Sequence, residues 1–154
     1  MAKFEIGVSD EQNSLQVDHG RLCEVIEMIL SDANLESAEI SVAIIDDPTM
    51  HQLNRDHLNH DYPTDVLSFV LERTDSTLDG EVIVSTDTAI ARAVEFRLSP
   101  ADELLLYVIH GTLHLVGYDD KDESKRPAMR QQEVHYLAKF GVRSTDRWAS
   151  GFSH

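Results

Sequence analysis

The sequence predicts a mixed α/β (α+β) domain, with a small sheet of about four strands covered by about five helices. Two observations lead to this prediction, one on the fold class and one on the number of domains. Short β-rich runs alternate with longer segments whose apolar residues recur every three or four positions. The chain has 154 residues, a length typical of one domain. We therefore expect a single domain over residues 1–154, whose tail from about residue 145 could fray.

The first half of the chain is predicted to run strand, helix, strand, helix. Residues 3–8 alternate apolar and polar side chains, as in a half-buried strand. Residues 19–30 carry apolar side chains at helical spacing. Residues 40–45, with the sequence ISVAII, form a β-rich run that ends at two aspartates. Pro48 then suits the first turn of a second helix, which extends to about His57.

The second half is predicted to begin with a hairpin and to end with three helices. Short strands are expected at 66–71 and 81–84, joined by a turn at Asp79-Gly80. The helices are expected at residues 86–96, about 101–116 and about 122–140. The middle one starts after Ser99 and Pro100 and is strongly apolar, which indicates a core helix.

The net charge of −15 disfavours a protein that binds nucleic acid over a broad basic surface. More than half of the basic residues lie in the last 34 positions: Lys121, Lys125, Arg126, Arg130, Lys139, Arg143 and Arg147. Two interpretations stay open, a local basic rim or a solvated helix face that pairs with nearby acids.

Cysteine content and hydropathy limit the compartment and the class of partner. Cys23 is the only cysteine, which excludes an intramolecular disulfide and a thiolate-rich zinc site. No run approaches the roughly 18 apolar residues of a membrane span. The first residues lack the pattern of a signal peptide. We expect a cytoplasmic protein with no disulfide partner and no membrane association.

The stretch from His110 to Asp120, HGTLHLVGYDD, predicts a metal site at the end of the core helix. Two histidines four residues apart lie on one helix face, where both can bind one metal. Gly117 can end the helix and turn the chain back, so that Asp120 becomes the third ligand. Three protein ligands leave one position of a tetrahedral zinc ion, or another divalent metal, for a water that would act in catalysis.

Two further residues of this stretch have predicted roles. Asp119 is the alternative third ligand, although we expect it to support a ligand through a hydrogen bond. Gly111 stands where zinc peptidases have a glutamate base, which disfavours a metalloprotease-like hydrolase. The sequence identifies no general base, and Glu81 is a candidate only by elimination.

This stretch closely resembles the signature of the YbeY family, whose pattern is His-Gly-x-Leu-His-Leu-x-Gly-Tyr-Asp-His. Two other blocks support the resemblance, one at Leu53-Asn54 and 61–69 (DYPTDVLSF) and one at 80–85 (GEVIVS). The resemblance implies a metal-dependent, single-strand-specific endoribonuclease of bacterial rRNA processing. It further implies maturation of the 16S rRNA 3′ end, a role in ribosome quality control, and single-stranded rRNA and the ribosome as partners.

The sequence departs from the family pattern at two positions. Asp120 stands in place of a histidine, and a carboxylate there favours slightly harder metals. Leu58 stands in place of an arginine thought to matter for RNA handling. Arg55, one helical turn earlier, could reach similar space, and His57 and His60 are nearby alternatives. These departures keep open a non-catalytic, metal-containing factor that associates with the ribosome.

The block at 64–69 is expected to be mainly structural, because it alternates with the period of a strand. Asp65 and Ser68 are its polar members. We expect these two residues, together with Arg55, to contribute to substrate binding where the strand meets the cleft.

Overall fold

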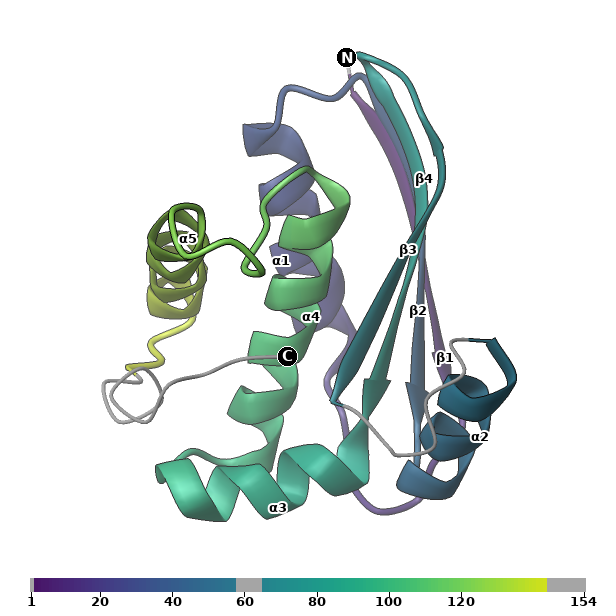
Figure 1. Ribbon diagram of the computed structural model, residues 1–154, viewed down its shortest axis with the longest axis vertical. Coiled ribbons are helices and arrows are strands. Elements are labelled where there is room, and N and C mark those ends of the chain that lie inside the picture. The colour runs from purple at the N-terminus through teal and green to yellow at the C-terminus, as the bar shows by residue number, and fades with distance from the viewer. Residues whose placement is uncertain (1, 58–64, 144–154) are drawn as a thin grey trace.

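The computed structural model describes residues 2–57 and 65–143 and confirms the mixed α/β fold class (Figure 1). The strands are β1 (Lys3–Asp10), β2 (Ser37–Ile45), β3 (Val66–Arg73) and β4 (Thr77–Ser85). The helices are α1 (His19–Asp32), α2 (Asp47–His57), α3 (Thr86–Phe96), α4 (Pro100–Leu115) and α5 (Arg126–Lys139). None of these helices has the length and apolar character needed to cross a membrane.

The four strands form one sheet in the order β1-β2-β4-β3. β1, β2 and β4 are parallel, and β3 is antiparallel to β4 at the edge. Val42 lies between Val8 on β1 and Val82 on β4, which sets the register of the three parallel strands. Because side chains alternate between the two faces of a strand, this register collects the branched apolar residues on one face of the sheet.

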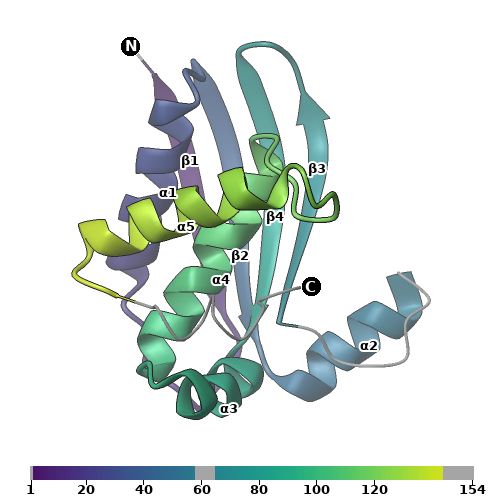
Figure 2. The same cartoon turned by 60° about the vertical axis from the view of Figure 1, so that its left-hand side comes forward.

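The helices form layers on the two faces of the sheet. α1 and α4 cover one face, α5 crosses the outside of α4, and α2 lies against the opposite face (Figures 1 and 2). α3 lies at the end of the sheet where α4 begins (Figure 1). α4 is therefore enclosed between the sheet and α5, in agreement with its predicted place in the core.

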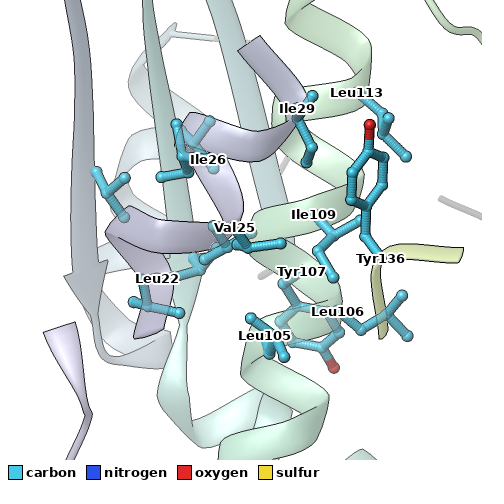
Figure 3. Close-up of a cluster of buried hydrophobic side chains, with 14 of the residues drawn as sticks. Leu22, Val25, Ile26, Ile29, Leu105, Leu106, Tyr107, Ile109, Leu113 and Tyr136 are labelled. Atoms are coloured by element: carbon cyan, nitrogen blue, oxygen red, sulfur yellow. The ribbon is translucent and has the colours of Figure 1, made fainter. Parts of the chain in front are cut away.

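The main core joins α1 to α4. Figure 3 shows apolar side chains of the two helices facing one another, with one tyrosine of α5 beside them: Leu22, Val25, Ile26, Ile29, Leu105, Leu106, Ile109, Leu113 and Tyr136. The Tyr136 hydroxyl donates a 2.6 Å hydrogen bond to Asp32 at the end of α1. Burial of the ring and this carboxylate raise the pKa of Tyr136. α5 is thus held to α1 as well as to α4.

The predicted turn at Asp79-Gly80 is wrong, because both residues lie within β4. The chain reverses instead at 74–76, where the Thr74 amide donates to the Thr77 carbonyl oxygen at 3.0 Å. Gly80 allows α4 to lie close to β4, because a Cβ atom at Gly80 would lie 3.0 Å from both terminal carbons of Leu115 in α4. A glycine signal that resembled a turn therefore reflects helix–sheet packing.

The last helix begins at Arg126, later than the predicted position of about residue 122. The Asp122 carboxylate accepts hydrogen bonds from the Ser124 amide and hydroxyl at 2.9 and 2.8 Å. These bonds lower the pKa of Asp122 and stabilise a turn that competes with helix at this position. Pro127 then occupies the first turn of α5. The tail that was expected to fray lies outside the described residues from 144 onward.

Gly111 allows α4 to approach the sheet. A Cβ atom at this position would lie 2.7 Å from Val82, 3.0 Å from the Ser68 hydroxyl and 3.1 Å from Val66. The first of these distances is shorter than real Cβ contacts, so any side chain would push α4 away from β3 and β4. The residue that we interpreted as a missing base is therefore required for packing.

We expect Gly111→Ala to lower the free energy of unfolding by about 1 kcal/mol, and by at most about 2 kcal/mol, measured by urea denaturation. Overpacking costs typically 1–3 kcal/mol, whereas the gain in helix propensity is about 1 kcal/mol. Gly20→Ala in α1 is the control, because a Cβ there makes only an ordinary 3.4 Å contact with Asp18. Equal or greater stability of Gly111→Ala would contradict the packing role.

Candidate metal centre

The end of α4 brings two histidines to one face of the helix, followed by a tight turn. His110 is buried, and His114 lies one turn later with its side chain 26% exposed. Gly117 adopts a φ of 113°, which favours glycine, and its amide donates to the His114 carbonyl oxygen at 3.1 Å. The chain then reverses, and Asp120 is buried beside both imidazoles.

One nitrogen or oxygen atom from each of the three predicted ligands lies within 4.8 Å of the other two. The two histidine Nε2 atoms lie 3.1 Å apart. Asp120 places Oδ1 3.3 Å from Nε2 of His114 and Oδ2 3.6 Å from Nε2 of His110. A tetrahedral ion with bonds of about 2.0–2.1 Å has ligand atoms about 3.3–3.4 Å apart. These three residues could therefore hold a metal ion.

The chemistry of the donors agrees with their spacing. Two imidazole nitrogens and one carboxylate oxygen form a donor set that zinc accepts, and three protein ligands leave a fourth position open. His114 is the most exposed of the three side chains. We infer that a small molecule or a substrate group would approach past His114.

A charged network on α5 borders this cluster, and the sequence reasoning missed it. Nδ1 of His110 lies 2.6 Å from Oε2 of Glu133. Nη1 of Arg130 donates to both oxygens of Glu133, at 3.0 and 3.2 Å, while Nη2 lies 3.8 Å from Oδ2 of Asp120. A signal was present, because Glu133 occupies the buried face of α5 together with Met129 and Tyr136. A glutamate at a core position of a helix indicates a specific partner.

Asp119 has a local contact in the structure. Its Oδ1 atom accepts a hydrogen bond from the Lys121 amide at 2.9 Å, which stabilises the turn after Tyr118. The carboxylate hydrogen-bonded to His110 is that of Glu133. The proposed support of a ligand by Asp119 stays a prediction.

Ser68 and Asp65 both lie close to α4 but in packed surroundings. The Ser68 hydroxyl donates to the Gly111 carbonyl oxygen at 3.0 Å. Asp65 is 1% exposed, and its Oδ2 lies 3.3 Å from Nη1 of Arg92 on α3. Burial, the Glu103 carboxylate and the Asp65 carboxylate raise the pKa of Tyr107. These contacts make both residues part of the helix–sheet interface, and their predicted role in substrate binding stays a prediction.

The structure does not bring Arg55 to the histidines. Arg55 is on α2, which packs against the face of the sheet opposite α4 (Figure 1). Glu81 also points to that opposite face, because its neighbours Gly80 and Val82 contact α4. Leu58 and His60 lie outside the described residues, as does the side chain of His57.

Four of the basic residues after the metal motif form two groups. Arg126 and Arg130 turn toward the cluster, with Nε of Arg126 donating to the Asp120 carbonyl oxygen at 2.9 Å. Lys121 and Lys125 are exposed on the segment between Asp120 and α5. The first group stabilises the site, and the second is available to a partner.

Comparison with known proteins identifies the family. The sequence model described as "Endoribonuclease YbeY" matches residues 7–141. An Endoribonuclease YbeY of Rhodopirellula baltica is 44% identical over 124 residues, which cover 77% of this chain and 64% of that relative. An Endoribonuclease YbeY of Desulfitobacterium hafniense is 35% identical over 153 residues, which cover 89% of this chain and 98% of that relative.

A solved structure agrees with the sequence comparison. The solution structure of TM1509 from Thermotoga maritima superposes with a TM-score of 0.63 at 26% identity, and the match covers 94% of this chain and 90% of that one. The family match extends through the sheet, α4 and α5, and so includes every element of the candidate metal centre. The chain belongs to the YbeY endoribonuclease family.

Proposed function

We propose that this protein is a metal-dependent endoribonuclease that cleaves single-stranded RNA, with ribosomal RNA as its substrate. The observation that carries the proposal is the convergence of His110, His114 and Asp120 in a chain whose relatives are named endoribonucleases. The proposed cellular role is rRNA processing in the cytoplasm, including 16S rRNA 3′ end maturation and ribosome quality control in contact with the ribosome.

The chain's own residues would hold one zinc ion per molecule. His110 and His114 offer Nε2 atoms from a rigid helix, and Asp120 offers a carboxylate oxygen from the following turn. When bound, the metal would polarise the phosphodiester and lower the pKa of a water in its open position. Asp120 makes the site less positive than a third histidine would, and the nearby guanidinium of Arg130 offsets part of that difference.

Packing of Gly111 argues against the metalloprotease-like alternative. A peptidase of this type needs a glutamate at that position as general base. Here a Cβ atom added at position 111 would lie closer to Val82 and Ser68 than an ordinary van der Waals contact, so a glutamate would have no room. RNA cleavage by a metal-activated water places no such demand on the side chain at position 111.

The metal assignment predicts that the purified protein binds one zinc ion and that His114→Ala abolishes this binding. Loss of one of two imidazoles from a three-ligand site removes a bond that nothing nearby replaces among the described residues. Bound metal is measured by mass spectrometry after gel filtration. His135→Ala is the matched control, because His135 is an exposed histidine on α5 outside the cluster. A wild-type protein without metal affinity would overturn the proposal.

If Asp120 is the third ligand, substitutions of Asp119 and Asp120 should lower zinc affinity by unequal amounts. Asp120→Ala should weaken zinc affinity by more than the roughly 10–100-fold loss typical of residues around the ligands. Asp119→Ala should have a smaller effect, because Asp119 bonds the Lys121 amide. Asp120→His should retain zinc, since imidazole is also a good ligand. Chelator competition gives the affinities, and a larger loss for Asp119→Ala would reverse the assignment.

Catalysis is tested with a labelled single-stranded RNA. We expect zinc-loaded protein to cleave it, chelation to stop cleavage, and His114→Ala to be inactive because it cannot retain the metal. A double-stranded RNA of the same sequence serves as the substrate control. Zinc binding without any cleavage would favour the non-catalytic ribosome-associated factor, and equal cleavage by His114→Ala would exclude this site as the catalytic centre.

A further inference from the structure

Glu133 is a fully buried carboxylate in the middle of α5. A carboxylate in the protein interior is strongly unfavourable without charged or hydrogen-bonding partners. Glu133 has both kinds, the Nδ1 atom of His110 at 2.6 Å and the guanidinium of Arg130 at 3.0 Å. Its burial is therefore explained by a specific contact with the first predicted metal ligand.

This contact decides which nitrogen of His110 can bind a metal. A carboxylate oxygen only accepts hydrogen bonds, so Nδ1 of His110 is the donor. In a neutral imidazole with the proton on Nδ1, Nε2 carries the free lone pair. Nε2 is the atom that lies 3.1 Å from His114 and 3.6 Å from Asp120. The hydrogen bond thus orients the ring and selects its tautomer in one step.

Arg130 fixes the carboxylate that makes this bond. Its Nη1 atom reaches both oxygens of Glu133, and only 12% of its side chain is exposed. Its Nη2 atom lies 3.8 Å from Asp120, so one cation stands between the two buried acids. Arg130 therefore restrains Glu133 and reduces the repulsion between the two carboxylates.

We propose that Glu133, held by Arg130, is a positioning residue that presents the Nε2 atom of His110 to the metal. The inference rests on the proposed metal function, because directing Nε2 of His110 toward an ion has an effect only if this site binds a metal. It assigns to α5 a role in metal affinity that the ligand spacing in the sequence does not contain.

A purely structural role makes a different prediction from a positioning role. Removing one partner of a buried ion pair lowers stability, so a loss of metal affinity has to be separated from a loss of stability. Glu133→Leu would extend the apolar face that Met129, Tyr136 and Leu137 already form on α5. If Glu133 is a positioning residue, metal affinity falls in Glu133→Leu even when the fold is retained. If its role is purely structural, metal affinity falls only in variants that also lose stability.

The experiment compares zinc affinity, by chelator competition, in wild type, Glu133→Ala, Glu133→Leu, Glu133→Gln and Gln131→Ala. We expect Glu133→Ala and Glu133→Leu to bind zinc about 10–100-fold more weakly. Glu133→Gln should lose less, because its carboxamide oxygen can still accept from Nδ1. Gln131→Ala is the matched control, since Gln131 is exposed on the same helix. Absorption spectra of the cobalt(II)-loaded proteins should change for Glu133→Ala and not for Gln131→Ala.

The outcomes separate this inference from the proposal on which it rests. Wild-type affinity and an unchanged cobalt spectrum in Glu133→Ala would overturn the inference and leave the metal site intact. No metal binding by wild type would overturn both. Urea unfolding of the metal-free proteins shows whether each variant folds. If Glu133→Ala does not fold, the nearly isosteric Glu133→Gln provides the test. Arg130→Gln alone should also weaken zinc affinity, because Glu133 loses the guanidinium that restrains it, and wild-type affinity in this variant would overturn the role of Arg130.

Discussion

The structure depends on the enclosure of α4, a helix that packs against the sheet on one side and α5 on the other, yet ends in two imidazoles. Contact with the sheet requires Gly111, because an added Cβ would lie 2.7 Å from Val82. The same enclosure excludes water from His110, so its ring atoms need fixed partners. Those partners come from the returning loop through Asp120 and from α5 through Glu133. The contacts that pack α4 therefore also bring the residues of the site together.

The order of the elements could be predicted because it follows from local patterns. Alternation defines β1, helical spacing defines α1, and the Ser99–Pro100 start is confirmed by a 3.0 Å hydrogen bond from the Asp102 amide to the Ser99 hydroxyl. The errors arise where one residue type has two physical uses. Gly80 signals a turn in sequence but allows Leu115 to approach in space. That distinction depends on a helix far along the chain, which no local window contains.

The same distinction between local and distant contacts explains which residues of the candidate site could be predicted. His110, His114 and Asp120 converge through one helical turn and one glycine turn, so their spacing alone was sufficient to group them. Glu133 is 23 residues from His110, and only the crossing of α5 over α4 brings them to 2.6 Å. Asp65 and Ser68 illustrate the converse: the place of Ser68 on a strand and of Asp65 just before it was foreseeable, but their contacts with Arg92 and Gly111 depend on α3 and α4.

The distribution of charge accounts for how so acidic a protein could act on RNA. Arg126 and Arg130 are directed toward Asp120 and Glu133, so part of the basic C-terminal segment compensates buried acids. Lys121 and Lys125 stay exposed on the segment between Asp120 and α5. Physiological salt screens charges over about 8 Å, so the overall charge of −15 repels RNA mainly at low ionic strength. Within that distance the charges of Lys121 and Lys125 act against the overall charge, and we infer that RNA would approach the candidate metal centre from the side where His114 is exposed.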